Sequence, residues 1–276
     1  MQRSATGSAC LRATVEVMSE TSAIRVGVVG AGGRMGRTVC AAVATDPALE
    51  LVAAVDLGSA GDDMQGIPIA GDLSALADAG AQVVVDFTVA EASRITLAWL
   101  AARGMHAVVG TTGFDEGDID TFRATFNASN CLIASNFAIS AVLMMRFAEM
   151  AAPWFDTAEI IELHHDQKID APSGTAMTTA QRMAASSPDW AADPTQHEVV
   201  AGARGGVGPA GIRVHSVRMR GMVAHQEVIL GALGQTLTIR QDSYDRSSYM
   251  PGVVLACKHV AQHPGLTLGL DSFLGV

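Results

Sequence analysis

The chain has 276 residues, of which 49% are hydrophobic and 17% are charged, and its formal net charge is −10. This length suits one large domain or two ordinary ones, and the apolar content is too high for a wholly disordered chain. The acidic balance, without a local run of lysine and arginine, argues against nucleic acid as a partner. No apolar stretch is long enough to predict a membrane span.

Residues 1–22 come before the first regular hydrophobic pattern. They contain no sustained apolar segment, which argues against a secretory signal, and Glu16 and Glu20 argue against a transit peptide. We therefore expect a disordered extension in this part of the chain.

The cysteines form no C-x-x-C pair, and small or apolar residues flank each of them. This pattern predicts buried free thiols in a reducing compartment, and so a cytoplasmic protein, rather than a disulfide framework. The four residues are Cys10, Cys40, Cys131 and Cys257.

A strand, a glycine-rich turn and a helix follow one another from residue 24 onward. The β-branched run Ile24–Gly30 predicts a buried parallel strand, and glycines 30, 33 and 36 open a helix that continues to about Ala44. A second strand, Leu49–Asp56, ends in an acid. This layout is typical of dinucleotide binding, because the helix N-terminus holds the pyrophosphate and the acid binds the ribose hydroxyls. The alternative is that the glycines only pack the helix against the sheet. The predicted cofactor residues of this unit are Gly30, Gly33, Arg34, Met35, Gly36 and Asp56.

The same unit leaves the choice between NADH and NADPH open. Asp56 favours NAD, since a carboxylate repels the 2′-phosphate of NADP. Arg34 and Arg37, however, lie in the turn near the position of that phosphate. Two positive charges compensate for one negative charge, so we predict that both cofactors are used without a strong preference.

Strands and helices continue to alternate up to residue 137. Strands are expected at Ala81–Thr88, His106–Gly113 and Cys131–Phe137, with helices at about Glu91–Arg103 and Asp115–Asn127. This alternation predicts a parallel sheet whose ligands bind beyond the carboxyl ends of the strands. Each turn taken alone is compatible with ordinary turn chemistry. Together they predict the nicotinamide end of the site, formed by Phe87, Thr88, Gly110, Thr111, Thr112, Ala134, Asn136 and Phe137.

The pattern changes after a helix predicted at Ile139–Ala151. A strand at Ala158–His165 and a helix at Gly174–Ala185 precede three strand-like runs within Gly211–Ser243, which we expect to form an antiparallel meander. A helix at about Ser248–Gln262 is expected to pack back on the first half. The predicted fold class is α/β: a Rossmann-like parallel-sheet domain plus an α+β substrate and oligomerisation domain with a mixed or antiparallel sheet. The expected boundaries are 23–137, with 247–276 returning to this domain, and 138–246.

The stretch ELHHDQKIDAPSGTA, residues 162–176, contains two adjacent histidines that allow a metal or an acid–base interpretation. Adjacent side chains of a strand point to opposite faces, so His164 and His165 could share an ion only if the strand broke there. No H-x-x-x-H pattern or cysteine set supplies further ligands. We therefore expect no metal site.

An anion site beside a proton donor fits the stretch better. Pro172 and Ser173 predict a helix start, at which Gly174 and Thr175 offer free N–H groups to a carboxylate. Lys168 adds a positive charge, and histidines release protons near neutral pH. The alternative is that the histidines are structural and the lysine is solvated. The clustering favours a site for a small acidic substrate opposite a nicotinamide.

These motifs resemble those of the 4-hydroxy-tetrahydrodipicolinate reductase (dihydrodipicolinate reductase) family of lysine and diaminopimelate biosynthesis, in its actinobacterial-like branch. The family pattern E-[AL]-H-H-x-x-K-x-D-A-P-S-G-T-A matches at every specified position, and the resemblance runs from about Ile24 to the C-terminus. Some relatives carry lysine in place of Arg34, so the resemblance does not settle the cofactor preference. The other matching motifs are the glycine loop Gly30–Gly36 and the turns Asp86–Thr88, Gly110–Gly113 and Asn136–Phe137.

The resemblance implies an NAD(P)H-dependent reduction of (2S,4S)-4-hydroxy-2,3,4,5-tetrahydrodipicolinate to tetrahydrodipicolinate, with loss of water. It implies that hydride goes to C4, that His164 donates the proton and that Lys168 assists. It also implies a homotetramer formed through the sheet of the second domain, with which the apolar alternation in Val214–Ile239 is compatible. It further implies cofactor contact by Arg246. The substrate residues that it implies are His165, Lys168, Ser173, Gly174 and Thr175.

Two other functions stay open at this point. A different dehydrogenase of the same architecture would keep the first half of the chain and lack the HHxxKxDAPSGT stretch. A non-catalytic NAD(H) sensor would bind the nucleotide and tolerate the loss of His164 and Lys168.

Overall fold

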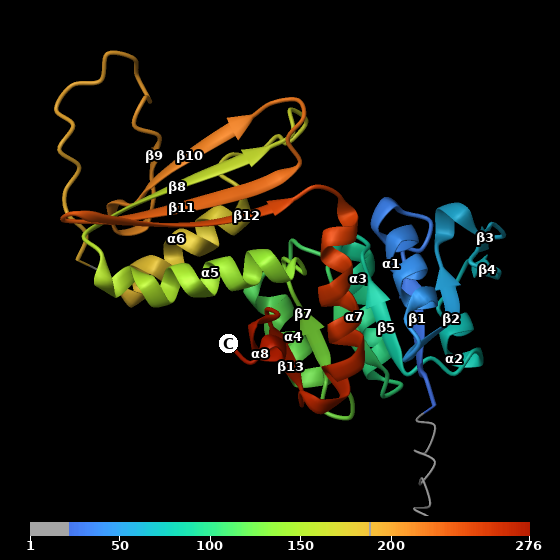
Figure 1. Ribbon diagram of the computed structural model, residues 1–276. Coiled ribbons are helices and arrows are strands. Elements are labelled where there is room, and N and C mark those ends of the chain that lie inside the picture. The colour runs from blue at the N-terminus through green and yellow to red at the C-terminus, as the bar shows by residue number, and fades with distance from the viewer. Residues whose placement is uncertain (1–21, 188) are drawn as a thin grey trace, which may run out of the picture.

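The computed structural model describes residues 22–187 and 189–276, which form two sheets with helices packed against them (Figure 1). Residues 1–21 of the expected extension, with Cys10, lie outside the described residues. The other three cysteines, Cys40, Cys131 and Cys257, are buried free thiols as predicted, and burial raises the pKa of Cys40 to about 12. Among the described residues, no helix is both long and apolar enough to cross a membrane.

The first sheet has eight strands in the order β13-β7-β6-β5-β1-β2-β4-β3, and all neighbours pair in parallel except β3 and β4. The expected strands and helices are confirmed, most of them somewhat shorter than predicted. Four short elements, β3, β4, α2 and β13, are present in addition to those predicted from the sequence. The strands are β1 (Ile24–Val29), β2 (Leu49–Val55), β3 (Asp63–Met64), β4 (Ile67–Ala70), β5 (Val83–Asp86), β6 (His106–Val109), β7 (Cys131–Ile133) and β13 (Leu266–Leu268).

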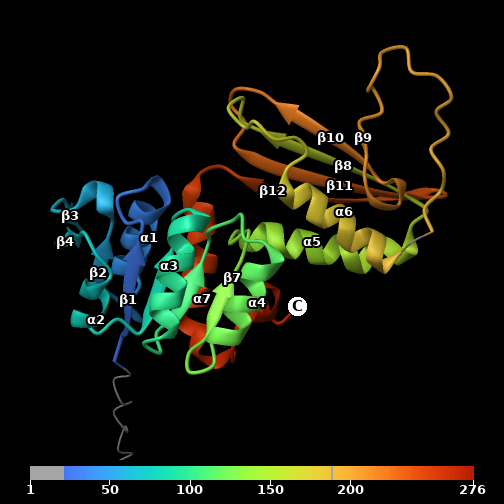
Figure 2. The same ribbon diagram turned by 180° about the vertical axis from the view of Figure 1, so that it is seen from behind.

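Helices cover both faces of this sheet (Figures 1 and 2). Val28 belongs to the core formed with α1 and α7, and its chain neighbour Val29 belongs to the core formed with α2, α3 and α4. Both faces are therefore dry, which explains why the strand sequences are continuously apolar rather than alternating. The helices are α1 (Arg34–Thr45), α2 (Ser74–Asp78), α3 (Ala90–Ala101), α4 (Glu116–Thr125) and α7 (Met250–His259).

The second sheet has five strands in the order β12-β11-β8-β10-β9. The expected antiparallel meander is wrong in one respect. β11 and β12 form a hairpin, but β8 lies between β11 and β10 and pairs in parallel with β10. The sheet is therefore mixed. Its strands are β8 (Thr157–His164), β9 (Gly206–Val207), β10 (Arg213–Arg218), β11 (Ala224–Ala232) and β12 (Gln235–Ser243).

Helices α5 (Ile139–Ala151) and α6 (Gly174–Ser186) pack on one face of the second sheet, and no helix among the described residues covers the other face (Figures 1 and 2). Ile160, Val228 and Leu230 belong to the covered face, and their core is continuous with that of the first sheet. After β12 the chain returns through α7, β13 and α8 (Asp271–Leu274) to the first sheet, as the sequence predicts for the C-terminal helix. Short 3-10 turns are η1 (Leu57–Ser59), η2 (Ala152–Trp154), η3 (Pro209–Gly211), η4 (Arg246–Tyr249) and η5 (Val260–Gln262).

Candidate active site

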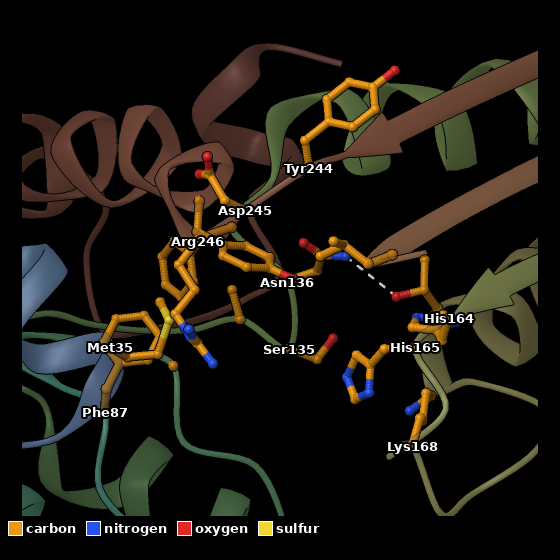
Figure 3. A pocket seen from close by; sticks show the side chains of 17 residues that line it. Met35, Phe87, Ser135, Asn136, His164, His165, Lys168, Tyr244, Asp245 and Arg246 are labelled. Carbon is orange, nitrogen blue, oxygen red and sulfur yellow. Dashed lines mark hydrogen bonds between the residues drawn. The ribbon is translucent and has the colours of Figure 1, made fainter. Parts of the chain in front are cut away.

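A cavity of about 620 Å³ lies where the carboxyl ends of the first sheet meet the second sheet. Its size is typical of small-molecule and cofactor sites. Figure 3 shows Met35, Phe87 and Arg246 on one side and the two histidines with Lys168 on the other. The lining residues are Met35, Phe87, Gly110, Ala134, Ser135, Asn136, Phe137, His164, His165, Lys168, Thr175, Val223, Ala224, Tyr244, Asp245, Arg246 and Tyr249.

The glycine loop leads into the N-terminus of α1 and leaves it open. Gly33 is the N-cap residue and provides no side-chain cap, so the first N–H groups of α1 stay available to an anion. A Cβ on Gly36 would lie 2.0 Å from the Gly30 carbonyl oxygen, so only glycine allows this close approach of helix and strand. Both features fit the pyrophosphate of a dinucleotide.

The acid at the end of β2 organises the same loop. Asp56 Oδ2 accepts a hydrogen bond from the Gly32 N–H at 3.1 Å, and Oδ1 accepts one from the Gly58 N–H at 2.9 Å. Arg37 donates to the Gly32 carbonyl at 3.0 Å, whereas Arg34 is exposed and forms no ion pair with any described residue. Arg34 is therefore the better placed of the two arginines to meet a ligand phosphate.

The turns after β5 and β7 bring two aromatic rings together at the cavity. Phe87 and Phe137 lie with ring centroids 5.7 Å apart, and a Cβ on Gly110 would lie 2.0 Å from the Phe87 ring. By contrast, Thr88 and Thr111 donate their hydroxyls to the buried Asp86 carboxylate at 2.6 and 3.2 Å. Burial raises the pKa of Asp86 in spite of these hydrogen bonds.

The structure thus divides the predicted cofactor residues into two groups. Met35, Phe87, Gly110, Ala134, Asn136, Phe137 and Arg246 line the cavity. The remaining ones do not: some lie in the glycine loop or at the end of β2, Thr88 and Thr111 bind Asp86, and Thr112 is exposed. These are Gly30, Gly33, Arg34, Gly36, Asp56, Thr88, Thr111 and Thr112.

The histidine pair lies at the end of β8, and both rings face the same cavity. The strand was expected to include His165, which would have put the two side chains on opposite faces, but it ends at His164. His164 Nδ1 donates to Glu162 Oε2 at 2.5 Å, and His165 Nδ1 accepts from the Gln167 N–H at 3.2 Å. Even so, no group of three or more potential metal ligands occurs in the described part of the chain.

The start of α6 has the predicted cap. Ser173 is the N-cap residue, and its hydroxyl accepts a hydrogen bond from the Ala176 N–H at 3.2 Å. Thr175 Oγ1 accepts from the Asn136 amide at 3.2 Å, which joins the two halves of the site, as the dashed line in Figure 3 shows. Ser173 and Gly174 lie beside the cavity rather than in its lining.

Lys168 is held close to the cavity and is not freely solvated. Its Nζ donates to both carboxylate oxygens of Asp170 at 2.8 Å, and its side chain is only 20% exposed. These hydrogen bonds lower the pKa of Asp170. The ion pair therefore holds the Lys168 side chain in one orientation beside the histidines.

The cavity also contains residues that were not predicted from the sequence. Tyr244, Asp245 and Tyr249 follow β12, and the polar run SYDRSSY at the end of a predicted strand was the available signal for them. Val223 and Ala224 reach the cavity only because Ala224 pairs with His164 in the sheet, which sequence periodicity does not disclose. Burial raises the pKa of Tyr249, which keeps its phenol neutral.

The site combines a parallel nucleotide-binding sheet and an open helix N-terminus with a histidine–lysine pair in the same cavity. This combination defines an NAD(P)H-dependent oxidoreductase. The comparisons with known proteins identify the family. Models of the dihydrodipicolinate reductase N-terminus and C-terminus match residues 24–137 and 140–274, respectively. The chain belongs to the dihydrodipicolinate reductase family.

Relatives similar in sequence include reductases from several actinobacteria. The 4-hydroxy-tetrahydrodipicolinate reductase of Corynebacterium efficiens is 52% identical over 258 residues, covering 91% of this chain and 99% of its own. That of Nocardia farcinica is 50% identical over 262 residues, covering 91% and 98%. A solved structure of dipicolinate-bound dihydrodipicolinate reductase from Paenisporosarcina sp. TG-14 has a TM-score of 0.83 and 36% identity, covering 91% of this chain and 99% of that chain. The resemblance read from the sequence motifs is confirmed.

Proposed function

We propose that this chain reduces (2S,4S)-4-hydroxy-2,3,4,5-tetrahydrodipicolinate to tetrahydrodipicolinate with NADH or NADPH and with loss of water, in lysine and diaminopimelate biosynthesis. The observation that carries the proposal is one cavity with an aromatic end at Phe87 and Phe137 and an acid–base end at His164 and Lys168. Both ends belong to motifs that the family shares.

The chemistry divides between the cofactor and the chain. A reduced nicotinamide held at the Phe87–Phe137 end of the cavity would supply the hydride for C4 of the dehydrated substrate. His164 supplies the proton at C3 from Nε2, since its Nδ1 is engaged with Glu162. Lys168 assists by placing a positive charge beside the substrate, where negative charge develops as the hydride arrives.

The substrate is held as a dicarboxylate. One carboxylate binds at the start of α6, where Gly174 and Thr175 offer N–H groups and the helix dipole is positive. His165 and Lys168 contact the same molecule from the cavity wall. The dipicolinate bound to the related Paenisporosarcina reductase supports a ligand with two carboxylates.

His164→Gln and Lys168→Ala test these roles. Each should lower kcat by about 100-fold or more, because a general acid contributes at least that factor, while NADH binding survives. His197→Gln is the matched control, since His197 is exposed in the loop between α6 and β9 and does not line the cavity. Wild-type kcat in both site variants would refute the roles and would favour the sensor.

We also infer that both cofactors are used and that the domain boundaries are residues 23–137, with 247–276 returning, and 138–246. Asp56 favours NADH, and the unpaired, exposed Arg34 favours NADPH. The three buried thiols support a reducing compartment, and hence the cytoplasm.

The uncovered face of the second sheet supports a homotetramer. Ile161, Leu163, Val217 and Ile229 share that face with charged residues such as Glu159 and Glu227, and they are only partly buried in the single chain. Exposed apolar side chains on one face of a sheet are typical of a surface that another subunit covers. Light scattering after size-exclusion chromatography should give four times the 28.6 kDa chain mass, and a monomer would contradict the assembly.

A further inference from the structure

Glu162 is a fully buried acid next to the active site, in contact with the ring of His164. Its side chain is 0% exposed, and it does not line the cavity. It accepts four hydrogen bonds: from His164 Nδ1 at 2.5 Å, from Arg218 Nη1 and Nη2 at 2.9 and 2.8 Å, and from the Ser173 N–H at 3.2 Å. A buried carboxylate with this number of donors is held in one orientation.

The partners of Glu162 belong to three separate parts of the site. His164 carries the proton, and Ser173 caps the helix whose N-terminus receives a substrate carboxylate. Arg218 also donates to the Asp170 carbonyl at 2.7 Å, and Asp170 in turn holds the Lys168 ammonium. One carboxylate therefore connects the proton donor, the anion site and the lysine loop.

We propose that Glu162 is a positioning residue that fixes the Nδ1–H tautomer of His164 and directs Nε2 into the cavity. This inference rests on the proposed role of His164 as the proton donor. An ionised carboxylate is an acceptor only, so the nitrogen facing it must carry hydrogen. After Nε2 gives its proton to the substrate, the neutral ring left behind is the tautomer that Glu162 stabilises.

The charge state of Glu162 agrees with this role. Burial by itself would raise its pKa, but the hydrogen bonds from His164 and Arg218 outweigh burial and lower the pKa to about 2. The group is therefore ionised throughout the pH range in which the enzyme works. The Arg218 guanidinium balances the buried charge, so His164 is not needed as a counter-ion and stays free to donate from its other nitrogen.

Glu159, on the opposite face of the same strand, provides a matched comparison. It accepts from His215 Nε2 at 2.6 Å and from Arg204 Nη2 at 2.6 Å, so it too joins a histidine and an arginine. Neither Glu159 nor His215 lines the active-site cavity. If the two glutamates only stabilise carboxylate–histidine–arginine clusters, replacing either one should change kcat to the same extent. A positioning role predicts a change in kcat at Glu162 alone.

Glu162→Gln separates positioning from simple stabilisation. The Ser173 N–H and Arg218 Nη2 both donate to Oε1, whereas Arg218 Nη1 and His164 Nδ1 meet Oε2. The amide oxygen of glutamine therefore takes the Oε1 position, where two donors meet it. The amide nitrogen is then left facing His164 Nδ1, which must accept a hydrogen bond and so adopts the Nε2–H tautomer. That ring cannot be protonated at Nδ1 without placing two donors against each other.

The test compares E162Q, E159Q and wild-type enzyme in steady-state kinetics, with NADH binding followed by fluorescence. We expect E162Q to lose about 100-fold or more in kcat, the factor that a general acid contributes, while the Kd for NADH stays within threefold of wild type. E159Q should keep its kcat. If E162Q keeps kcat within threefold of wild type, or if E159Q loses as much as E162Q, the positioning role is overturned.

A measurement on the wild-type enzyme keeps the proposal testable if E162Q does not fold. Nitrogen-15 NMR of labelled histidine reports which ring nitrogen carries hydrogen, and H164Q identifies the signals of His164 by their loss. We expect hydrogen at Nδ1 in the neutral ring, and hydrogen at Nε2 would overturn the inference. An H164Q variant with full kcat refutes the proposed proton donor instead, whereas an inactive H164Q beside an active E162Q refutes only the role of Glu162.

Discussion

Replacing Gly36 with alanine tests whether the glycine loop is a packing device, a cofactor site or both. The new Cβ would lie 2.0 Å from the Gly30 carbonyl oxygen and 2.7 Å from Ala31 Cα, against the roughly 3.5–4.0 Å of an ordinary carbon contact. Both obstacles are backbone atoms at the end of β1. Relief therefore requires α1 to move away from the strand, since no side chain can rotate out of the way.

The expected magnitude follows from two opposing effects. Overpacking of this kind costs about 3 kcal/mol, at the upper end of its usual range, because the clash is with backbone. Alanine in a helix recovers about 1 kcal/mol relative to glycine. We therefore expect the free energy of unfolding to fall by about 2 kcal/mol. We also expect NADH to bind about tenfold more weakly, because the displaced helix no longer directs its N–H groups at the pyrophosphate.

Urea unfolding followed by circular dichroism, with NADH titration of the folded protein, measures both effects. Gly71→Ala is the control, because its Cβ would lie 3.6 Å from the Ala60 side chain, an ordinary contact. If G36A unfolds at the same urea concentration as G71A, the steric argument is wrong. If G36A is less stable but binds NADH like the wild type, Gly36 serves only the packing of helix against sheet.

Three further predictions concern pH, cofactor and the nicotinamide end. Because the folded pKa of Glu162 is lowered from 4.5 to about 2, its contribution to stability is present above pH 4.5 and is lost as pH falls toward 2. The contribution to the free energy of unfolding amounts to about 3 kcal/mol. Urea unfolding measured across this pH range should therefore show a smaller loss of stability toward low pH in E162Q than in the wild type. The KM values for NADH and NADPH should differ by less than about 100-fold (2.7 kcal/mol), with R34A shifting the ratio toward NADH, and a larger wild-type difference would contradict dual use. Gly110→Ala should displace Phe87 from Phe137 and raise the KM for NADH by about tenfold, and an unchanged KM would show that the ring does not help to bind the nicotinamide.

The first sheet could be predicted from the sequence because its signals are local. Apolar runs such as Val83–Asp86, buried on both faces, and glycines at fixed distances identify strand, turn and helix without knowledge of distant contacts. Short elements carried no such signal. β13 has only three residues, and it can be recognised as a strand only from the pairing of Leu266 with Cys131 at the edge of the sheet.

The second sheet was harder to predict because its strand order depends on pairing between distant segments. Three strand-like runs in succession favour a meander, since neighbouring strands usually pair along the chain. Here β8 takes the central place, and the apolar alternation of the later strands is the same for either order. The ending of β8 at His164 rather than His165 likewise reflects the tight turn that follows, which the β-branched pattern before it does not encode.

The central place of β8 is also what makes the active site possible. In the parallel pairing of β8 with β10, Arg218 lies beside His164 and Ser216 beside Glu162, all on the face covered by α6. A shift of one residue in this pairing would turn Arg218 to the uncovered face and leave the Glu162 carboxylate buried without its counter-ion. The family motif, which begins in β8, therefore works only together with β10, whose Arg218 lies 56 residues after Glu162. The contact of Arg218 with Glu162 is thus the best indication that the site is correctly assembled, although Arg218 lies outside the motif.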